Sequence, residues 1–142
     1  ILVPHRDEFS ETVGYLIKGE LKSALFLPDI DKWEKWDKKI EDFIRNVDYA
    51  FIDGTFYDGS EIPHRNMNEI PHPFVLETLE RFKNLKKKNK KKIYFIHLNH
   101  TNPLLKASNK ITKEIIKRGY NIARTGMKFD LWRLGKTYLK II

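Results

Sequence analysis

Several side chains that can bind a metal or move a proton stand where an apolar stretch ends. The clearest case is the segment IYFIHLNHTNP, residues 93–103, in which a β-prone run ends at His97. Polar residues crowd the positions that follow: Asn99, His100, Thr101 and Asn102. Because α/β proteins commonly place ligand and metal chemistry at strand ends, the pattern predicts a functional position at His97. Its polar neighbours are expected to shape the turn, orient ligands or contact substrate.

Four further residues have a similar placement in the sequence: His5, Asp29, Asp53 and His72. Each lies where an apolar element gives way to a loop or where a helix begins. In a layered α/β fold the carboxyl ends of the strands share one edge of the sheet, so these residues can converge. Their separation along the chain is a weaker signal than a local motif such as HxxxH on a helix. We expect Asp53 to support the ligands or contact substrate.

Each candidate also has a structural alternative. Asp29 suits a turn, but Asp31 is the expected helix cap, which leaves Asp29 free at a strand end and favours a functional role. His97 can be a partly buried histidine bonded to the backbone, and His5 can be a surface loop residue. His72 can cap the helix that follows it, a position that satisfies free amides and lowers the pKa of a histidine.

The elements in the first half of the chain alternate between strand and helix. Strands over 12–17 and 23–27 are expected to form a hairpin with Gly19 in its turn. A helix capped by Asp31 and running to about residue 46 follows, because its apolar residues recur at three- and four-residue steps. These residues predict one buried stripe: Trp33, Trp36, Ile40, Phe43, Ile44 and Val47.

The second half continues the alternation after a long polar loop over 55–71, to which we assign His64. A helix beginning near Pro73 is expected to bury Leu76 with other apolar residues. A further helix over 112–117 is expected to stop at Gly119. The strands predicted for the rest of the fold cover residues 49–52, 93–96, 120–123, 129–132 and 137–141.

Composition limits the class of protein. With 142 residues, of which 41% are hydrophobic and 13% aromatic, the chain has the length and composition of one folded domain. No apolar run approaches the roughly 20 residues that span a bilayer, so we expect no membrane insertion and a cytoplasmic location. The absence of cysteine excludes disulfides and thiolate ligands, so any metal must be held by His, Asp or Glu.

The net charge of +8 is concentrated in one lysine run. Lysines at the end of a helix complement its dipole and are tolerated in a solvated loop, which favours a structural interpretation. The run lacks the interleaved aromatic and arginine residues that single-stranded nucleic acids usually recruit, so a nucleic-acid partner is not favoured. The lysine run consists of Lys83, Lys86, Lys87, Lys88, Lys90, Lys91 and Lys92.

Several segments together resemble the second half of a metallo-β-lactamase-fold hydrolase. They are PHRDEFSETVGYLI, LFLPDID, DYAFIDGTFYDGSEIPHRNMNEIPHPF, IYFIHLNHTNP and RTGMKFDL. The likeness is greatest to the pyrroloquinoline quinone biosynthesis protein B branch and weaker to RNase Z-type nucleases and a phosphonate-breakdown phosphodiesterase. It implies that residues 1–142 are the C-terminal half of an αββα sandwich, one sheet with flanking helices. The other half would be a missing N-terminal segment or a separate chain, and one sheet face would be uncovered without it.

The resemblance also implies roles for the candidate residues. His5 matches a ligand that completes the first metal site, Asp29 the carboxylate that bridges two metals, and His97 a ligand of the second metal. His72 matches a histidine that donates a proton or contacts phosphate. The implied cofactors are two divalent cations, with zinc favoured and manganese or iron as alternatives.

Two departures from the family pattern qualify these roles. The signature HxHxDH, which supplies most ligands of the first metal, is absent from the 142 residues. Since each metal wants about four ligands, another segment must supply the rest. The quinone-biosynthesis branch commonly has a cysteine-rich zinc loop and often lacks the equivalent of His5, whereas this chain has His5 and no cysteine. That difference favours a hydrolase-like relative.

We therefore expect a metal-dependent hydrolase that cleaves a phosphoester or another small anionic ester with metal-activated hydroxide. One alternative is a metal-dependent oxidoreductase in quinone cofactor biosynthesis. Another is a metal-free nucleic-acid-binding module that uses the lysine run. The expected partners are the N-terminal half of the fold and a small anionic substrate, with a homodimer as a further way to cover the open face.

Overall fold

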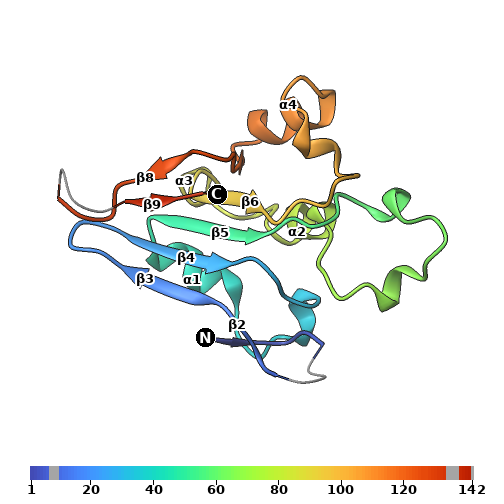
Figure 1. Cartoon of the computed structure of the whole chain (residues 1–142), viewed down its shortest axis with the longest axis horizontal. Coiled ribbons are helices and arrows are strands. Elements are labelled where there is room, and N and C mark those ends of the chain that lie inside the picture. Colours follow the sequence, from blue (N-terminus) through green and yellow to red (C-terminus); the bar gives the residue numbers. More distant parts are fainter. Residues whose placement is uncertain (7–9, 134–137, 142) are drawn as a thin grey trace.

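The computed structural model describes residues 1–6, 10–133 and 138–141, and its centre is a five-stranded sheet (Figure 1). Its strands follow in the order β3 (Tyr15–Lys18), β4 (Ser23–Leu27), β5 (Tyr49–Asp53), β6 (Ile93–Ile96) and β7 (Asn121–Ile122). β3 and β4 form the predicted antiparallel hairpin, and each later strand is parallel to its neighbour. The parallel strands β4, β5 and β6 therefore end at the same edge of the sheet.

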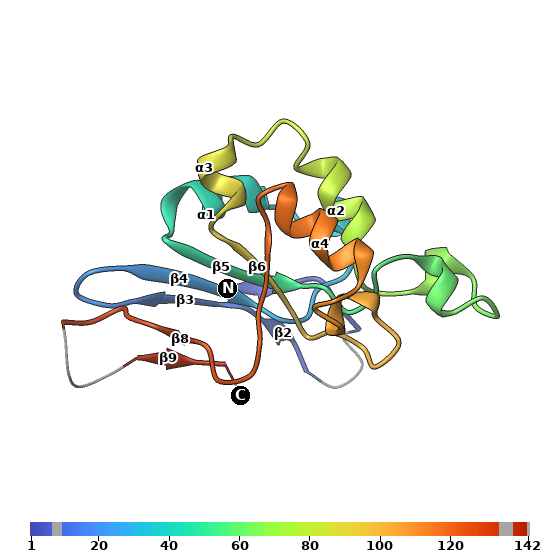
Figure 2. The same cartoon turned by 90° about the horizontal axis from the view of Figure 1, so that it is seen from above.

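The helices that connect the parallel strands lie over one face of the sheet (Figure 2). Right-handed crossovers place successive helices on the same side when strands are added in one direction. The main core lies between this face and the helices, where Ile40, Ile44, Leu79 and Phe82 are buried. The α-helices are α1 (Ile40–Asn46), α2 (Val75–Arg81), α3 (Lys87–Lys90) and α4 (Lys110–Lys117). The 3-10 helices are η1 (Trp33–Lys35), η2 (Gly59–Glu61), η3 (Met67–Glu69) and η4 (Pro103–Leu105).

The opposite face of the sheet is covered in part by the end of the chain. β8 (Lys128–Phe129) and β9 (Leu139–Lys140) pair antiparallel on the side of the sheet away from the helices (Figure 2). The rings of Phe51 and Phe129 pack edge to face with centroids 4.8 Å apart, and Ile96 is buried in the same cluster. The face that was expected to be uncovered therefore has its own small core.

An apolar groove remains beside this small core. It encloses ≈ 530 Å³ and is lined mainly by Tyr15, Ile17, Phe26, Ile96 and Ile141. Tyr15 leaves 56% of its surface exposed. This groove is a part of the second face that the described residues leave open.

The strand predicted over 12–17 is divided at Gly14. β2 (Thr12–Val13) pairs with β1 (Leu2–Val3), whereas β3 pairs with β4. A Cβ at Gly14 would lie 2.5 Å from Leu27 Cδ1, so a side chain there would force the buried Leu27 to move where the chain passes from one pairing to the other. The division matters for the site because the loop between β1 and β2 contains His5.

The helix predicted over 31–46 is interrupted. η1 begins after Lys32, so Asp31 is not its cap, and the chain becomes extended at Trp36 before α1 begins. The indole of Trp33 donates to Thr78 Oγ1 at 2.8 Å, while that of Trp36 donates to the Leu2 carbonyl at 3.1 Å. Because the two indoles bind partners on different elements, the interruption depends on tertiary contacts that helical periodicity does not contain.

The remaining elements follow the sequence predictions with shifted ends. α2 starts at Val75 and leaves Leu76 40% exposed, so the predicted burial of Leu76 is wrong. α4 begins before the predicted residue 112, and Gly119 follows it with φ +93°. β7 and β8 are shorter than the runs predicted over 120–123 and 129–132. β9 lies within the predicted run 137–141, whose first residue is outside the described part of the chain.

Part of the lysine run has structural contacts. Lys92 Nζ donates to the carbonyls of Ile44 and Arg45 at the end of α1, and Lys90 Nζ donates to the Lys83 carbonyl. These bonds satisfy carbonyls at helix ends, as the structural interpretation expects. Within residues 1–6, 10–133 and 138–141, no helix has the length and apolar character needed to cross a bilayer.

We predict that residues 1–142 expressed alone associate with themselves. The apolar groove on the second face gains free energy when it is covered, at about 25 cal/mol per Å² of apolar surface. Analytical ultracentrifugation over a range of concentrations measures the association, and adding the other half of the fold should abolish it. A stable monomer at every concentration would contradict the prediction.

Candidate metal centre

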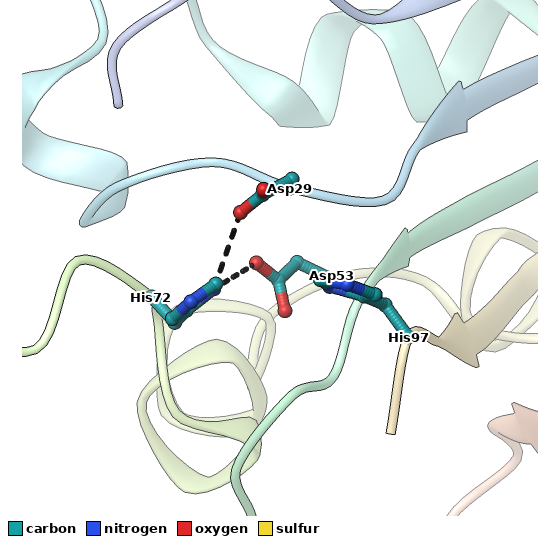
Figure 3. Close-up of side chains that lie close together, drawn as sticks. All are labelled: Asp29, Asp53, His72 and His97. Carbon is teal, nitrogen blue, oxygen red and sulfur yellow. Dashed lines mark hydrogen bonds and ion pairs between the residues drawn. The ribbon is translucent and has the colours of Figure 1, made fainter. Parts of the chain in front are cut away.

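Three parallel strands and one helix deliver polar side chains to the same edge of the sheet (Figure 3). Asp53 is the last residue of β5, His97 follows β6 directly, and Asp29 lies in the segment that leaves β4. His72 stands just before α2. His97 has φ 57° and is the single non-glycine residue with positive φ in the described part of the chain, a conformation associated with functional sites.

These side chains are close enough to share a cation. One possible ligand atom from each of Asp29, Asp53, His72 and His97 lies within 4.8 Å of those of the others. His5 also reaches the group, with Nε2 3.3 Å from Asp29 Oδ1. The structure thus brings together His5, Asp29, Asp53, His72 and His97, while their individual roles stay predictions.

The loop that carries His5 is held beside the site by a backbone contact. The Asp31 amide donates to the Pro4 carbonyl at 2.7 Å, which joins the start of the β1–β2 loop to the segment after β4. The ring of His5 lies 5.4 Å from that of His72 between centroids. His5 is therefore part of the cluster through the position of its loop as well as through Asp29.

Asp53 is the anchor of the cluster. Its side chain has no solvent exposure. Oδ1 accepts from the Thr55 amide at 2.8 Å and from Thr55 Oγ1 at 2.7 Å. Oδ2 accepts from the Ile30 amide at 3.3 Å and is 2.8 Å from His72 Nδ1. Because a carboxylate has about four acceptor positions, these contacts use its capacity and favour a supporting role for Asp53 over direct metal binding.

The same carboxylate sets the tautomers of two histidines. His72 Nδ1 faces Asp53 Oδ2, so Nδ1 is the protonated nitrogen and Nε2 is left for another partner. The Thr55 hydroxyl donates its one proton to Asp53, so it accepts from His97 Nδ1 at 3.1 Å. His97 Nε2 then has no hydrogen bond to any of the described residues. A histidine whose other nitrogen donates to a carboxylate or hydroxyl has the arrangement usual for metal ligands.

Two buried atoms of the cluster lack a hydrogen bond within the described residues: Asp29 Oδ1 and His5 Nδ1. Asp29 Oδ1 also lies 3.4 Å from His72 Nδ1, whose proton is directed to Asp53. A buried carboxylate oxygen without a donor is costly unless a cation or a proton neutralises it. Carboxylate oxygens and imidazole nitrogens suit zinc, manganese or iron, so these residues fit a divalent metal.

The electrostatic surroundings act strongly on His72. Burial favours its neutral form, but the hydrogen bond to Asp53 and the charges of Asp53 and Asp29 outweigh burial and raise the pKa of His72 above its ordinary value. The charge of Arg6 acts in the opposite direction. In the protein without bound metal, His72 therefore keeps a proton to higher pH than an ordinary histidine.

Some of the polar residues after His97 make hydrogen bonds that connect neighbouring loops, whereas others are exposed. Asn102 is 2% exposed and donates to the carbonyls of Gly54 and Thr55, which fixes the end of β5. Thr101 donates to Glu61 Oε2 and accepts from Asn99. These residues hold the loops around the site. The exposed histidines His64 and His100 are not among the residues that converge.

Thr55 and Glu61 are contributors that the sequence analysis missed. A signal for Thr55 existed in the spacing Asp53-Gly54-Thr55, since a carboxylate that binds the amide two residues later is a common turn. Its link to His97 has no local signal because the two residues are 42 positions apart. Glu61 likewise acts through Thr101, which is 40 positions away.

Comparison with known proteins assigns the chain to a family. A profile described as beta-lactamase superfamily domain matches residues 2–98, and the chain belongs to that superfamily. The chain is 29% identical over 143 residues to coenzyme PQQ synthesis protein B of Pseudomonas savastanoi pv. phaseolicola, an alignment that covers 90% of this chain and 44% of that protein. It is 26% identical to the protein of the same name from Gluconobacter oxydans, covering 85% of this chain and 40% of that one.

The chain spans less than half the length of these curated relatives. Together with the five-stranded sheet and its flanking helices, this length is consistent with the C-terminal half of a larger domain. The family generally binds divalent metals, in agreement with the donor set at the sheet edge. The resemblance in the sequence segments is therefore confirmed at the level of family and fold.

We predict that Thr55→Val lowers the affinity of the complete domain for Zn²⁺ about 10- to 100-fold, because His97 Nδ1 loses its acceptor. Competition with a chromogenic chelator measures the affinity. Thr78→Val is the matched control, since it removes the buried bond to Trp33 and should lower the free energy of unfolding without changing metal affinity. Equal Zn²⁺ affinities in the two variants would contradict the prediction.

Proposed function

We propose that the complete protein is a metal-dependent hydrolase that cleaves a phosphoester or another small anionic ester. The observation that supports this most is the convergence of Asp29, His72 and His97 around buried Asp53, which fixes two imidazoles with Nε2 available. Hydrolysis at such a site needs stabilisation of negative charge on the substrate and a proton for the leaving group.

In this proposal His5, Asp29 and His97 hold two divalent ions, with zinc favoured and manganese or iron as alternatives. The bound ions would supply a water of lowered pKa and neutralise charge on the substrate oxygens. Asp29 is suited to bridge because its buried Oδ1 is near His5 while lacking a hydrogen bond in the described residues. Residues 1–142 would act as the C-terminal half, and the other half would complete the ligands.

His72 is proposed as the proton donor. Asp53 holds its Nδ1, so Nε2 is the nitrogen that can deliver a proton to a leaving oxygen. The neighbouring carboxylates stabilise the imidazolium form. Asp53 thereby orients the donor and compensates its charge without contacting the substrate.

A second candidate is a metal-dependent oxidoreductase in quinone cofactor biosynthesis. The names of the relatives support it, since they are coenzyme PQQ synthesis proteins. The same histidine and carboxylate donors accept iron. The two candidates differ in what the metal-loaded protein consumes. The hydrolase consumes an ester and water, whereas the oxidoreductase consumes an oxidant.

We predict that metal analysis of the complete protein finds about two divalent ions per chain and that Asp29→Ala abolishes both metal binding and ester hydrolysis. Asp37→Ala, at an exposed carboxylate, is the control and should change neither. An Asp29→Ala variant that keeps its metals and its activity would refute the bridging role. Oxygen consumption by the iron-loaded protein without ester hydrolysis would favour the second candidate.

We predict that His72→Gln keeps the metal content but lowers kcat about 100-fold or more for an ester with an alkoxide leaving group. An ester that releases p-nitrophenolate needs no proton, so its kcat should fall much less. Steady-state kinetics on the two esters, with metal analysis of the same samples, gives the comparison. Loss of metal in His72→Gln, or equal losses for both esters, would show that His72 is not the donor.

A further inference from the structure

A cavity beside the candidate metal centre carries two arginines that the proposed reaction does not use. We propose that this cavity is a subsite for a second anionic group of the substrate, a carboxylate or a phosphate, bound by Arg65 and Arg6. The inference rests on the proposed function and extends it, because it assigns the substrate two separate negative charges.

The cavity adjoins the metal centre directly. It encloses ≈ 430 Å³ and shares His5 and His72 with the cluster described above. Its other polar side chains are Arg6, Arg65 and Asn99, and none of its described lining residues is acidic. A volume in this range suits a small ligand. The cavity thus combines two cationic side chains with the proposed proton donor.

The pairing of Arg6 and Arg65 differs from that of other arginines in the described part of the chain. Within the described part of the chain, no carboxylate lies at ion-pair distance from Arg6 or Arg65, whereas Arg45 binds Asp42 and Arg81 binds Glu41. Arg6 acts electrostatically on His72, which places its charge near the reacting end of the site. Planar guanidinium groups bind carboxylate and phosphate oxygens in pairs, more specifically than lysines do.

The loop that carries Arg65 is fastened to the site. It runs from β5 to α2 and projects from the carboxyl edge of the sheet, shown in green in Figure 1. Glu61 accepts from the Tyr57 amide and from Thr101 Oγ1, which ties this loop to the one after β6. The Arg65 amide donates to the Ile62 carbonyl at 3.1 Å. A backbone held in this way lowers the entropy cost of binding.

The other lining residues of the cavity indicate the chemistry of the uncharged part of the substrate. Phe56, Ile62 and Ile70 are apolar residues that also line the cavity. The ring of Phe56 lies edge-on to His72 with centroids 6.0 Å apart, and Ile70 is 4% exposed. These surfaces fit a compact apolar or aromatic group. The substrate class is therefore a small ester whose leaving group, on the His72 side, carries an anionic substituent.

A matched pair of esters tests the subsite in the complete, zinc-loaded protein: methyl 3-carboxyphenyl phosphate and methyl 3-carbamoylphenyl phosphate. We expect the protein to prefer the carboxylate in kcat/KM. Arg65→Gln should lower kcat/KM about tenfold for the carboxylate ester and leave the carboxamide ester unchanged, as for loss of one charged hydrogen-bonded contact. Arg65→Lys should keep part of the preference, and Arg118→Gln, at an exposed arginine on the end of α4, should keep all of it.

No preference for the carboxylate ester, or an equal loss on both esters in Arg65→Gln, would overturn the subsite while leaving the hydrolase proposal intact. If neither ester is hydrolysed, the proposed function fails and binding decides the subsite. Inorganic phosphate is then titrated into the metal-free protein and followed by ³¹P NMR. Binding that weakens about tenfold in Arg65→Gln but not in Arg118→Gln supports the subsite, and equal binding in the two variants, or none in the parent protein, overturns it.

Discussion

A carboxylate without access to water needs donors for both oxygens, and Asp53 finds them in three separate parts of the chain. The Thr55 groups come from the turn after β5, the Ile30 amide from the segment after β4, and His72 from the start of α2. Through the Thr55 hydroxyl the network reaches His97 after β6. Removing one partner would leave a buried charge under-compensated, so the network holds these loops in a single arrangement.

The sheet makes this network possible. Because β4, β5 and β6 are parallel neighbours, the segments that follow them meet at one edge, and the residues at their ends need only short side chains to reach Asp53. Asn102 binds the carbonyls of Gly54 and Thr55 and so keeps the Thr55 turn in register with the loop after His97. The site is therefore built on rigid strand ends, with longer loops adding His5 and the arginine cavity around it.

The sequence predicted the parts of the fold that depend on neighbouring residues. Apolar runs that end in polar residues located β4, β5, β6 and their edge, and so the convergence of His97 with Asp29 could be anticipated. What it missed depends on partners far along the chain. The Trp33 and Trp36 indoles bind Thr78 and Leu2 and break a helix that looked continuous. The packing of Phe129 on Phe51 and the bond between Thr55 and His97 are likewise invisible to periodicity.

The two histidines that the Asp53 network fixes line different cavities, so the two sides of the site differ in chemistry. His72 lines the cavity that contains the arginines, whereas His97 lines the apolar groove on the second face of the sheet. In the proposed reaction the proton donor and the cationic subsite lie on the same side, so the half of the substrate that departs would also be the half that is recognised by charge. The groove on the His97 side is mainly apolar, with Lys140 among its lining residues, and it continues the small core around Phe51. That groove is better suited to packing against the rest of the domain than to selecting an anion.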